Sequence, residues 1–592
     1  MLDLLPLEPR REPKKLGRFH RGAHKPLSIR WFGMTALAGH LRHLLAVAAA
    51  SNQLDLRDWM RPEDAAGLLN RVCQVLGASA PGSALTERLG REVWIDFVAD
   101  TGDDHDVSLA VGRMLFAEYA LSGDQLRRLP RGDILVFGGD VAYPASTAYE
   151  LKRRLLSPWN QVLLGMAEGD RRRVVLGIPG NHDWYDGLDG FGRLFRRSAL
   201  KDFVEPTTET GGSSAPSGDS FSERIEGGLK RLLHLDEFDE SLHLVEEAAV
   251  SLAAILLRST LRRPSRLALV GYTAVQEASY WALALAPGLD LWGLDRQLRD
   301  ADFRQRAFFA RRRAEAHPHK FVLVAPDPAL AYGEPNEPGM KILESCHFSL
   351  ASDKILYLTG DAHHYERQAV GDSMHVIAGG GGAFLHGTRI ARDSNAVPPQ
   401  CVYPDRSASL RLALSMPLRL AVGTAGFLPH GVFALLALIE IVAFRHGPIT
   451  GGLIVAAVIL IAIFSLSLAI RARLERPAAT YAVASLFGLI LSLTPLGLRF
   501  ALSGALPWLG DLLAVGLGNA VLGSLTLGVF LLVLILTGLE HQQGFAALGH
   551  PGFRHFVRIC VYPGGRVEGF VIGKDDPIGE GPPVLIDRFA WD

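Results

Sequence analysis

Short runs of apolar, β-prone residues alternate with helix-like segments through the first two thirds of the chain. Three of these runs, at residues 134–137, 174–178 and 355–358, continue directly into loops that hold polar residues. Such runs are typical of buried strands. Helical periodicity at 107–121 comes before the first of these runs, and helical periodicity at 149–168 lies between the first and the second. This alternation of strands and helices predicts an α/β fold.

Beyond about residue 410 the pattern changes to long apolar runs. Four of them follow one another, at 420–444, 449–470, 478–498 and 512–538. A helix needs about 20 apolar residues to cross the hydrocarbon core of a bilayer, so these runs predict four transmembrane helices. Buried core helices of a soluble domain are the alternative, and four such runs in succession argue against it.

Basic residues between the runs set the expected orientation. The connection between the second and third runs holds Arg471, Arg473 and Arg476, whereas the other two connections hold only Arg445 and Arg499. The middle connection is therefore expected in the cytoplasm. Four spans then place the N-terminal region and the C-terminal tail there too, in a protein of the inner or plasma membrane. The first thirty residues contain no apolar segment typical of a signal peptide.

These patterns divide the chain into five parts. In chain order they are a basic tail and helical region (1–90), an α/β domain (91–390) with a disordered or helical insert (about 205–263), a linker (391–419), four transmembrane helices (420–540), and a cytoplasmic tail with a β-hairpin (541–592). The hairpin is expected from two apolar runs on either side of Pro563-Gly564-Gly565. Because a two-stranded hairpin is marginally stable alone, we expect it to dock on another part of the protein.

Composition and charge narrow the function classes. The chain has 592 residues and a net charge of −1, which gives no electrostatic case for a nucleic-acid partner. Its hydrophobic content of 48% agrees with a membrane region, which could also form a homo-oligomer. The four cysteines are far apart in sequence and indicate neither a disulfide framework nor a zinc–thiolate site.

Polar residues with metal-binding chemistry stand where the predicted strands end. They are Asp100 after 93–98, Asp140 and Tyr143 after 134–137, Asn181, His182 and Asp183 after 174–178, and Asp361 and His363 after 355–358. Strand ends that bring such residues together from distant segments are how α/β proteins build a site. Each motif alone could be a turn or a helix cap. The ordered set favours a metal site.

The motifs also carry a resemblance to a known family. Asp-x-Gly at Asp100, Gly-Asp-x-x-Tyr at Asp140, Gly-Asn-His-Asp at Asn181 and Gly-x-x-His-x-Tyr-Glu-Arg at His363 resemble the calcineurin-like metallophosphoesterase superfamily. The pattern is most similar to the purple acid phosphatase branch. The resemblance covers about residues 93–387 and implies a two-sheet sandwich flanked by helices, with a two-metal site at strand ends.

The resemblance implies a first metal site of Asp100, Asp140, Tyr143 and His363. A tyrosine ligand favours a hard ion such as ferric iron, whereas a Tyr143 that only packs leaves Mn²⁺, Fe²⁺ or Zn²⁺ equally open. The implied reaction is hydrolysis of a phosphate mono- or diester by a metal-activated hydroxide. His182 resembles the general acid of the family, and Asp183 is expected to orient it.

The second half of the implied site departs from the family pattern. Asn181 and the shared Asp140 are present, but Asp361 replaces one histidine, and Pro326-Asp327 stands where another is expected. Carboxylate-rich sites suit Mg²⁺ or Mn²⁺. The second ion is therefore different, weaker or missing.

Three further residues are candidates for this site. Asp103 and His105 lie near enough to Asp100 in sequence to supply a substitute ligand. The run from Gly379 to His386 either forms a wall of the site, with His386 near the phosphate, or makes a turn between strands.

The leading hypothesis is a membrane-anchored, metal-dependent phosphoesterase acting on a phosphate-ester substrate. The altered second half favours an alternative, a metal- or phosphate-binding signalling module of the same fold that has lost turnover. A transporter with a soluble regulatory domain is a third hypothesis. It is the weakest, because the apolar runs hold few ionisable residues and show no evident repeat.

Overall fold

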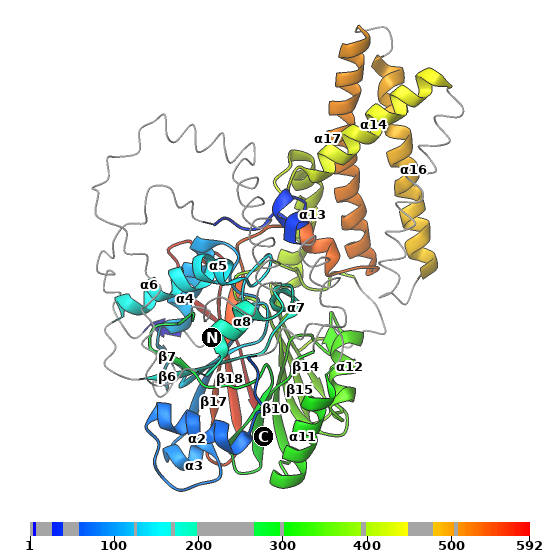
Figure 1. Cartoon of the computed structure of the whole chain (residues 1–592). Coiled ribbons are helices and arrows are strands. Elements are labelled where there is room, and N and C mark those ends of the chain that lie inside the picture. Colours follow the sequence, from blue (N-terminus) through cyan, green and yellow to red (C-terminus); the bar gives the residue numbers. More distant parts are fainter. Residues whose placement is uncertain are drawn as a thin grey trace, which may run out of the picture.

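A computed structural model describes most of the chain (Figure 1). The described residues are 4–6, 26–39, 59–122, 127–166, 172–197, 266–296, 301–391, 398–447, 477–502 and 507–592. The insert expected at about 205–263 and the span expected at 449–470 lie outside these residues.

Two seven-stranded sheets form the body of the protein. Sheet I has the order β19-β18-β17-β2-β5-β6-β7. Its parallel strands are β2 (Val93–Val98), β5 (Ile134–Phe137), β6 (Arg173–Gly177) and β7 (Tyr272–Ala274). Its antiparallel strands are β17 (Arg554–Val561), β18 (Val567–Lys574) and β19 (Val584–Trp591).

Sheet II has the order β16-β14-β15-β13-β10-β9-β8. Its parallel strands are β9 (Leu289–Gly293), β10 (Lys320–Ala325), β13 (Lys354–Thr359) and β15 (Ser373–Ala378). The antiparallel strands at its two edges are β8 (Trp281–Ala286), β14 (Tyr365–Val370) and β16 (Cys401–Tyr403).

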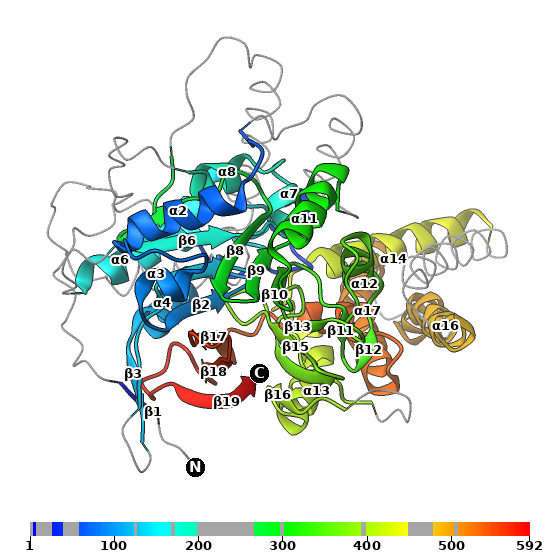
Figure 2. The ribbon, with the colours of Figure 1, turned by 90° about the horizontal axis from the view of Figure 1, so that it is seen from below.

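The main hydrophobic core lies between the two sheets. Side chains such as Phe97 and Val136 of sheet I pack in one cluster with Leu291 and Val324 of sheet II. Helices α2 (Ala65–Leu76) and α3 (Leu85–Leu89) join this cluster. The outer faces are covered by α4 (His105–Phe116) and α6 (Ser157–Gly165) on sheet I, and by α11 (Phe303–Ala316) and α12 (Glu337–Ser345) on sheet II (Figure 2). The predicted mixed α/β class with two sheets is confirmed.

Two short segments differ from the sequence prediction. The helix expected at 107–121 ends at Phe116, and the chain then forms β3 (Tyr119–Leu121), which pairs with β1 (Leu4–Pro6) and β4 (Arg127–Leu129). The helix expected at 149–168 consists of α5 (Ala148–Glu150), a π-helical turn (Leu151–Leu156) and α6.

The C-terminal tail is part of sheet I. The predicted hairpin is β17 and β18, and a third strand that was not predicted from the sequence, β19, extends it. Strand β17 pairs with β2 from Val557 to Val561, with Ile559 opposite Ile95. Because all of β17 and nearly all of β18 are buried, the tail belongs to the same folding unit as the α/β domain.

Four helices stand together at one end of the sandwich (Figure 1): α13 (Arg406–Val422), α14 (Leu428–His446), α16 (Pro477–Leu502) and α17 (Trp508–Thr537). In the described part of the chain, two segments are long and apolar enough to cross a membrane, Tyr481–Leu502 and Trp508–Thr537. They match two of the four predicted spans.

The span expected at 420–444 is wrong. Helix α13 ends at Val422, and α14 begins at Leu428 with a shorter apolar stretch, Leu428–Val442. Gly423 and Gly426 cause the break because their φ angles of 82° and 122° turn the chain out of a helix. A hydropathy pattern does not register such a turn. The segment 391–419, expected to be a linker, contains β16 and most of α13.

Candidate metal centre

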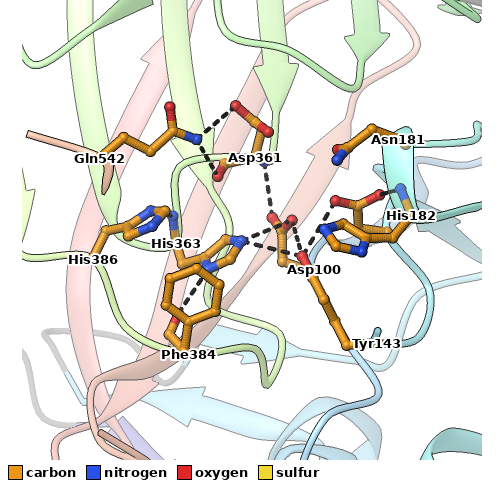
Figure 3. A network of polar contacts seen from close by, with 12 residues as sticks. Asp100, Tyr143, Asn181, His182, Asp361, His363, Phe384, His386 and Gln542 are labelled. Carbon is orange, nitrogen blue, oxygen red and sulfur yellow. Dashed lines mark hydrogen bonds and ion pairs between the residues drawn. The ribbon is translucent and has the colours of Figure 1, made fainter. Parts of the chain in front are cut away.

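The carboxyl ends of strands from both sheets meet at the predicted site (Figure 3). Asp100 follows β2, Asp140 follows β5 and Asn181 follows β6 in sheet I, whereas Asp361 and His363 follow β13 in sheet II. A pocket there is lined by Asp100, Gly138, Gly139, Asp140, Gly180, Asn181, Pro326, Asp327 and Asp361. The structure therefore brings together the residues that the motifs singled out.

Three of these aspartates have unusual backbone conformations. Asp100, Asp140 and Asp361 have φ angles of 58°, 50° and 63°, in the left-handed region that side-chain-bearing residues rarely adopt. Such conformations cluster where a binding or catalytic site requires them. The adjacent glycines leave no room for a side chain, since a Cβ at Gly360 would lie 2.5 Å from Oδ2 of Asp100. The backbone thus turns three carboxylates toward one point.

The hydroxyl of Tyr143 lies at the centre of the first half of the site. It is 3.0 Å from Oδ1 of Asp100, 3.3 Å from Oδ2 of Asp140 and 3.1 Å from Nε2 of His363. Neighbouring ligands of one ion with bonds of about 2.1 Å are about 3 Å apart in octahedral geometry. The other three donors each lie at about that distance from the phenol oxygen, and Nε2 of His363 is 3.4 Å from Oδ1 of Asp100, so this part of the site fits a metal ion.

The phenol oxygen of Tyr143 lies between the two carboxylates and the imidazole of this set. Among the described residues, no group of three or more His, Cys, Asp or Glu side chains alone is placed to hold a metal ion. The carboxylates and the imidazole converge on a phenol oxygen, which becomes a ligand if the Tyr143 proton is lost. The ligand set implied by the family resemblance stays a prediction.

His363 is oriented for ligation. Its Nδ1 donates a hydrogen bond to the carbonyl oxygen of Phe384 at 2.7 Å, because a carbonyl can only accept. In the neutral imidazole Nε2 then carries the lone pair, and Nε2 is the atom that faces Tyr143 and Asp100. A backbone carbonyl behind the ring is the usual partner of a metal-bound histidine.

The glycine-rich loop after β15 supports His363 from behind. The His386 ring stacks on the His363 ring with centroids 4.4 Å apart, and its Nδ1 accepts a hydrogen bond from the backbone N–H of His363 at 2.9 Å. Burial lowers the pKa of His386 well below its usual value, so the ring is neutral. His386 therefore positions His363.

The acidic groups of the centre disfavour their own ionisation. Burial raises the pKa of Asp140 well above its usual value, and the nearby carboxylates of Asp100, Asp183 and Asp361 raise it further. Burial also raises the pKa of Asp100, although the neighbouring His363 lowers it in part. Burial raises the pKa of Tyr143 as well, and the carboxylates of Asp100 and Asp140 raise it further. A bound cation would reverse this balance. The donor set therefore fits a metal ion electrostatically as well.

His182 lies beside these donors at the start of α7 (Asn181–Trp184). Its backbone N–H donates to Oδ1 of Asp140 at 2.8 Å, and its ring packs against Tyr143 and Tyr185. Nδ1 donates to the carbonyl oxygen of Pro144 at 2.7 Å, so the tautomer is fixed with Nε2 as the reactive nitrogen.

Asp183 has a different partner from the one expected. Its carboxylate accepts hydrogen bonds from the backbone N–H groups of Asp140, Gly180 and Val141, at 2.9, 2.8 and 3.3 Å. Burial raises its pKa to about 6 although these donors favour the charged form. The expectation that Asp183 orients His182 is wrong. The carboxylate oxygens of Asp183 accept hydrogen bonds from the backbone of the two neighbouring loops, and the carbonyl of Pro144 accepts the hydrogen bond from the His182 ring.

Replacing Asp183 by alanine is expected to destabilise the fold by about 3 kcal/mol or more, because three buried N–H groups lose their acceptor. The measurement is the unfolding transition of the detergent-solubilised protein. Asp189→Ala serves as the matched control. Its carboxylate is 44% exposed and makes a surface ion pair with Arg193, so its loss should cost at most about 0.5 kcal/mol. If Asp183→Ala and wild type had the same free energy of unfolding, the hydrogen bonds of Asp183 to the two loops would not stabilise the fold.

The second half of the site is rich in carboxylates. Asn181 donates from Nδ2 to the hydroxyl of Tyr185 at 3.0 Å, which leaves Oδ1 as its acceptor or ligand atom. The backbone N–H of Asp361 donates to Asp100, and its side chain accepts from Gln542 at 3.0 Å. Asp327 lines the same pocket and pairs with Arg296.

Asp103 and His105 do not join the centre. Oδ1 of Asp103 accepts the backbone N–H of Ile29 at 2.7 Å, and Nδ1 of His105 contacts Asp106 at 3.1 Å. Neither residue lines the pocket of the centre, so neither is placed as a substitute ligand there.

Three residues near the centre were not found from the sequence. Gln542 follows α17 and reaches Asp361, and Trp31 packs against Phe384 and His182 with ring centroids 4.8 and 5.7 Å apart. Neither carries a local signal, since each comes from outside the α/β segment. Arg296 follows the end of β9, as the other site residues follow their strands, and that position was the signal that could have found it.

Comparison with known proteins gives no matching family for this chain and no match among curated proteins.

Proposed function

We propose that this protein is a membrane-anchored, metal-dependent phosphoesterase that hydrolyses phosphate mono- or diesters. One observation carries the proposal. Donor atoms of Asp100, Asp140 and His363 lie 3.0 to 3.3 Å from the hydroxyl of Tyr143, a distance typical of neighbouring ligands of one ion, beside a histidine with a fixed tautomer. A buried acidic cluster of this kind has little structural value without a cation.

The centre would hold at least one ion such as Fe, Mn, Zn or Mg. A bound ion would supply Lewis acidity and lower the pKa of water at the site. His182 would act in its doubly protonated form, donating the proton on Nε2 to the leaving oxygen of the ester and returning to the neutral tautomer whose Nδ1 donates to Pro144. The carbonyl of Pro144 and the rings of Tyr143 and Tyr185 would keep its imidazole aimed at that oxygen.

Membrane anchoring is proposed from α16 and α17, which are long enough and apolar enough to span a bilayer. Apolar side chains also stand exposed on α13, at every fourth position: Leu410, Leu414, Leu418 and Val422. Such a stripe fits a lipid surface better than water. We place the catalytic domain and the C-terminal strands in the cytoplasm, as the basic connection 471–476 favours.

The test uses inverted membrane vesicles washed with alkaline carbonate. They should retain the protein and hydrolyse an added aryl phosphate mono- or diester when Mn²⁺ or Fe is supplied, and a chelator should remove the activity. Sealed right-side-out vesicles should be inactive until detergent opens them. If the alkaline carbonate wash released the protein from the vesicles, the proposed membrane anchoring would be refuted. Tight metal binding without hydrolysis at any pH or with any metal would refute the enzyme and favour a binding module.

A further inference from the structure

Arg296 brings a positive charge to the half of the centre where a second metal ion is expected. It lies just beyond the end of β9, and its Nη1 pairs with Oδ1 of Asp327, which follows the adjacent strand β10. Asp327 lines the pocket together with Asp361 and Asn181. The guanidinium therefore stands beside the carboxylates that would have to bind the second ion.

The surrounding charges hold Arg296 in this place. Burial lowers the pKa of its guanidinium, but Asp327, Asp361 and Asp140 together outweigh burial and raise it. The Arg296 side chain is 19% exposed, and the Asp327 side chain is 4% exposed. Nε of Arg296 is buried and has no hydrogen-bond partner within the described part of the chain. The Asp327 pair thus leaves part of the hydrogen-bonding capacity of Arg296 unused.

We propose that the guanidinium of Arg296 replaces the second metal ion, so that the centre binds one ion and Arg296 binds the non-bridging oxygens of a phosphate group. The inference rests on the proposed function. A permanent cation next to Asp327 repels a divalent ion at the same carboxylates. A planar guanidinium also matches two oxygens of one phosphate, which an ammonium does not.

The donor sets of the two halves support this division. In the first half, a histidine and two carboxylates lie at ligand spacing from the phenol oxygen of Tyr143. The second half offers Asn181, whose amide donates to Tyr185, and Asp361, whose carboxylate accepts from Gln542. The residues of the second half therefore fit a phosphate anion bound by Arg296 better than they fit a second metal ion.

Metal content tests the first part of the proposal. Full-length protein in detergent is stripped with a chelator, reloaded with Mn²⁺, desalted and analysed for metal per chain. We expect one Mn²⁺ in wild type and in Arg296→Lys, and two in Arg296→Met, in which the positive charge is lost. Arg197→Met is the control, because Arg197 is 52% exposed and pairs with Glu277 on the surface. Two Mn²⁺ per wild-type chain would overturn the proposal.

Phosphate binding tests the second part. Equilibrium dialysis of Mn²⁺-loaded protein against labelled inorganic phosphate should give at least tenfold weaker binding for Arg296→Met than for wild type. Asp327→Asn should bind phosphate at least as tightly as wild type and should still hold one Mn²⁺. If Asp327 were a metal ligand, this variant would lose Mn²⁺, and the proposal would fail. A purely structural ion pair would lower the unfolding temperature of both variants without changing either readout, which would also overturn it.

These readouts need no turnover. A protein that binds one Mn²⁺ and phosphate through Arg296 but hydrolyses no ester would sink the proposed function and leave this inference standing. A hydrolase with two Mn²⁺ per chain would do the opposite.

Discussion

Asp140→Asn is expected to lower the hydrolysis of phosphate esters by about 10³-fold or more. Asp140 is 3% exposed and stands between the two halves of the centre. Oδ2 faces the hydroxyl of Tyr143, and Oδ1 accepts the backbone N–H of His182. The substitution removes the negative charge that a metal ion needs but keeps the size of the side chain.

The same substitution should not destabilise the metal-free protein. An amide at position 140 can still accept the His182 N–H, and its NH₂ can donate to the hydroxyl of Tyr143. It also removes the repulsion from the carboxylates of Asp100, Asp183 and Asp361, which burial makes expensive. We therefore expect the chelator-treated variant to unfold at or above the wild-type temperature. Turnover of an aryl phosphate and thermal unfolding are the two measurements.

Asp133→Asn is the matched control. Asp133 precedes β5, the strand whose other end leads to Asp140, and it is equally buried at 1% exposure. It pairs with Arg91 and accepts the backbone N–H of Trp94. Its loss should lower stability and leave turnover within about twofold of wild type. Asp140→Asn protein with wild-type turnover would refute the metal centre, and so would equal losses in both variants.

The strand ends of the site could be predicted from the sequence because the signal is local. A buried parallel strand is a short apolar run, and the polar residue directly after it must stand at the carboxyl edge of the sheet. Asp100, Asp140, Asn181 and Asp361 all follow this rule. The same reasoning applies to Arg296, which follows β9.

Contacts between distant segments could not be predicted in this way. Gln542 meets Asp361 across 181 positions of sequence, and nothing in the periodicity of α17 specifies that contact. The role of Asp183 depends on the backbone directions of two loops, which the motif Gly-Asn-His-Asp does not record. The break between α13 and α14 depends on two glycine φ angles. In each case a tertiary contact or a backbone dihedral angle decided the outcome.

His182→Ala is expected to slow hydrolysis most for esters whose leaving group has a high pKa and least for esters whose leaving group has a low pKa. A general acid contributes about 10²–10⁴-fold when the leaving oxygen needs a proton. An alkyl phosphate should therefore lose activity by that factor, whereas an activated nitrophenyl phosphate should retain nearly all of it. The measurement is kcat for a series of phosphate esters with rising leaving-group pKa. The slope of log kcat against that pKa should be steeper in the variant than in wild type.

A packing role for His182 would give a different result. Its ring touches Tyr143 at a centroid distance of 4.4 Å, so its removal could loosen a metal ligand. That defect would slow every ester equally and would reduce bound metal. The exposed His319, at the amino end of β10, provides the control His319→Ala, which should match wild type across the series. A uniform loss with reduced metal content would therefore assign His182 to support of Tyr143, whereas a leaving-group-dependent loss with full metal content would assign it to proton transfer.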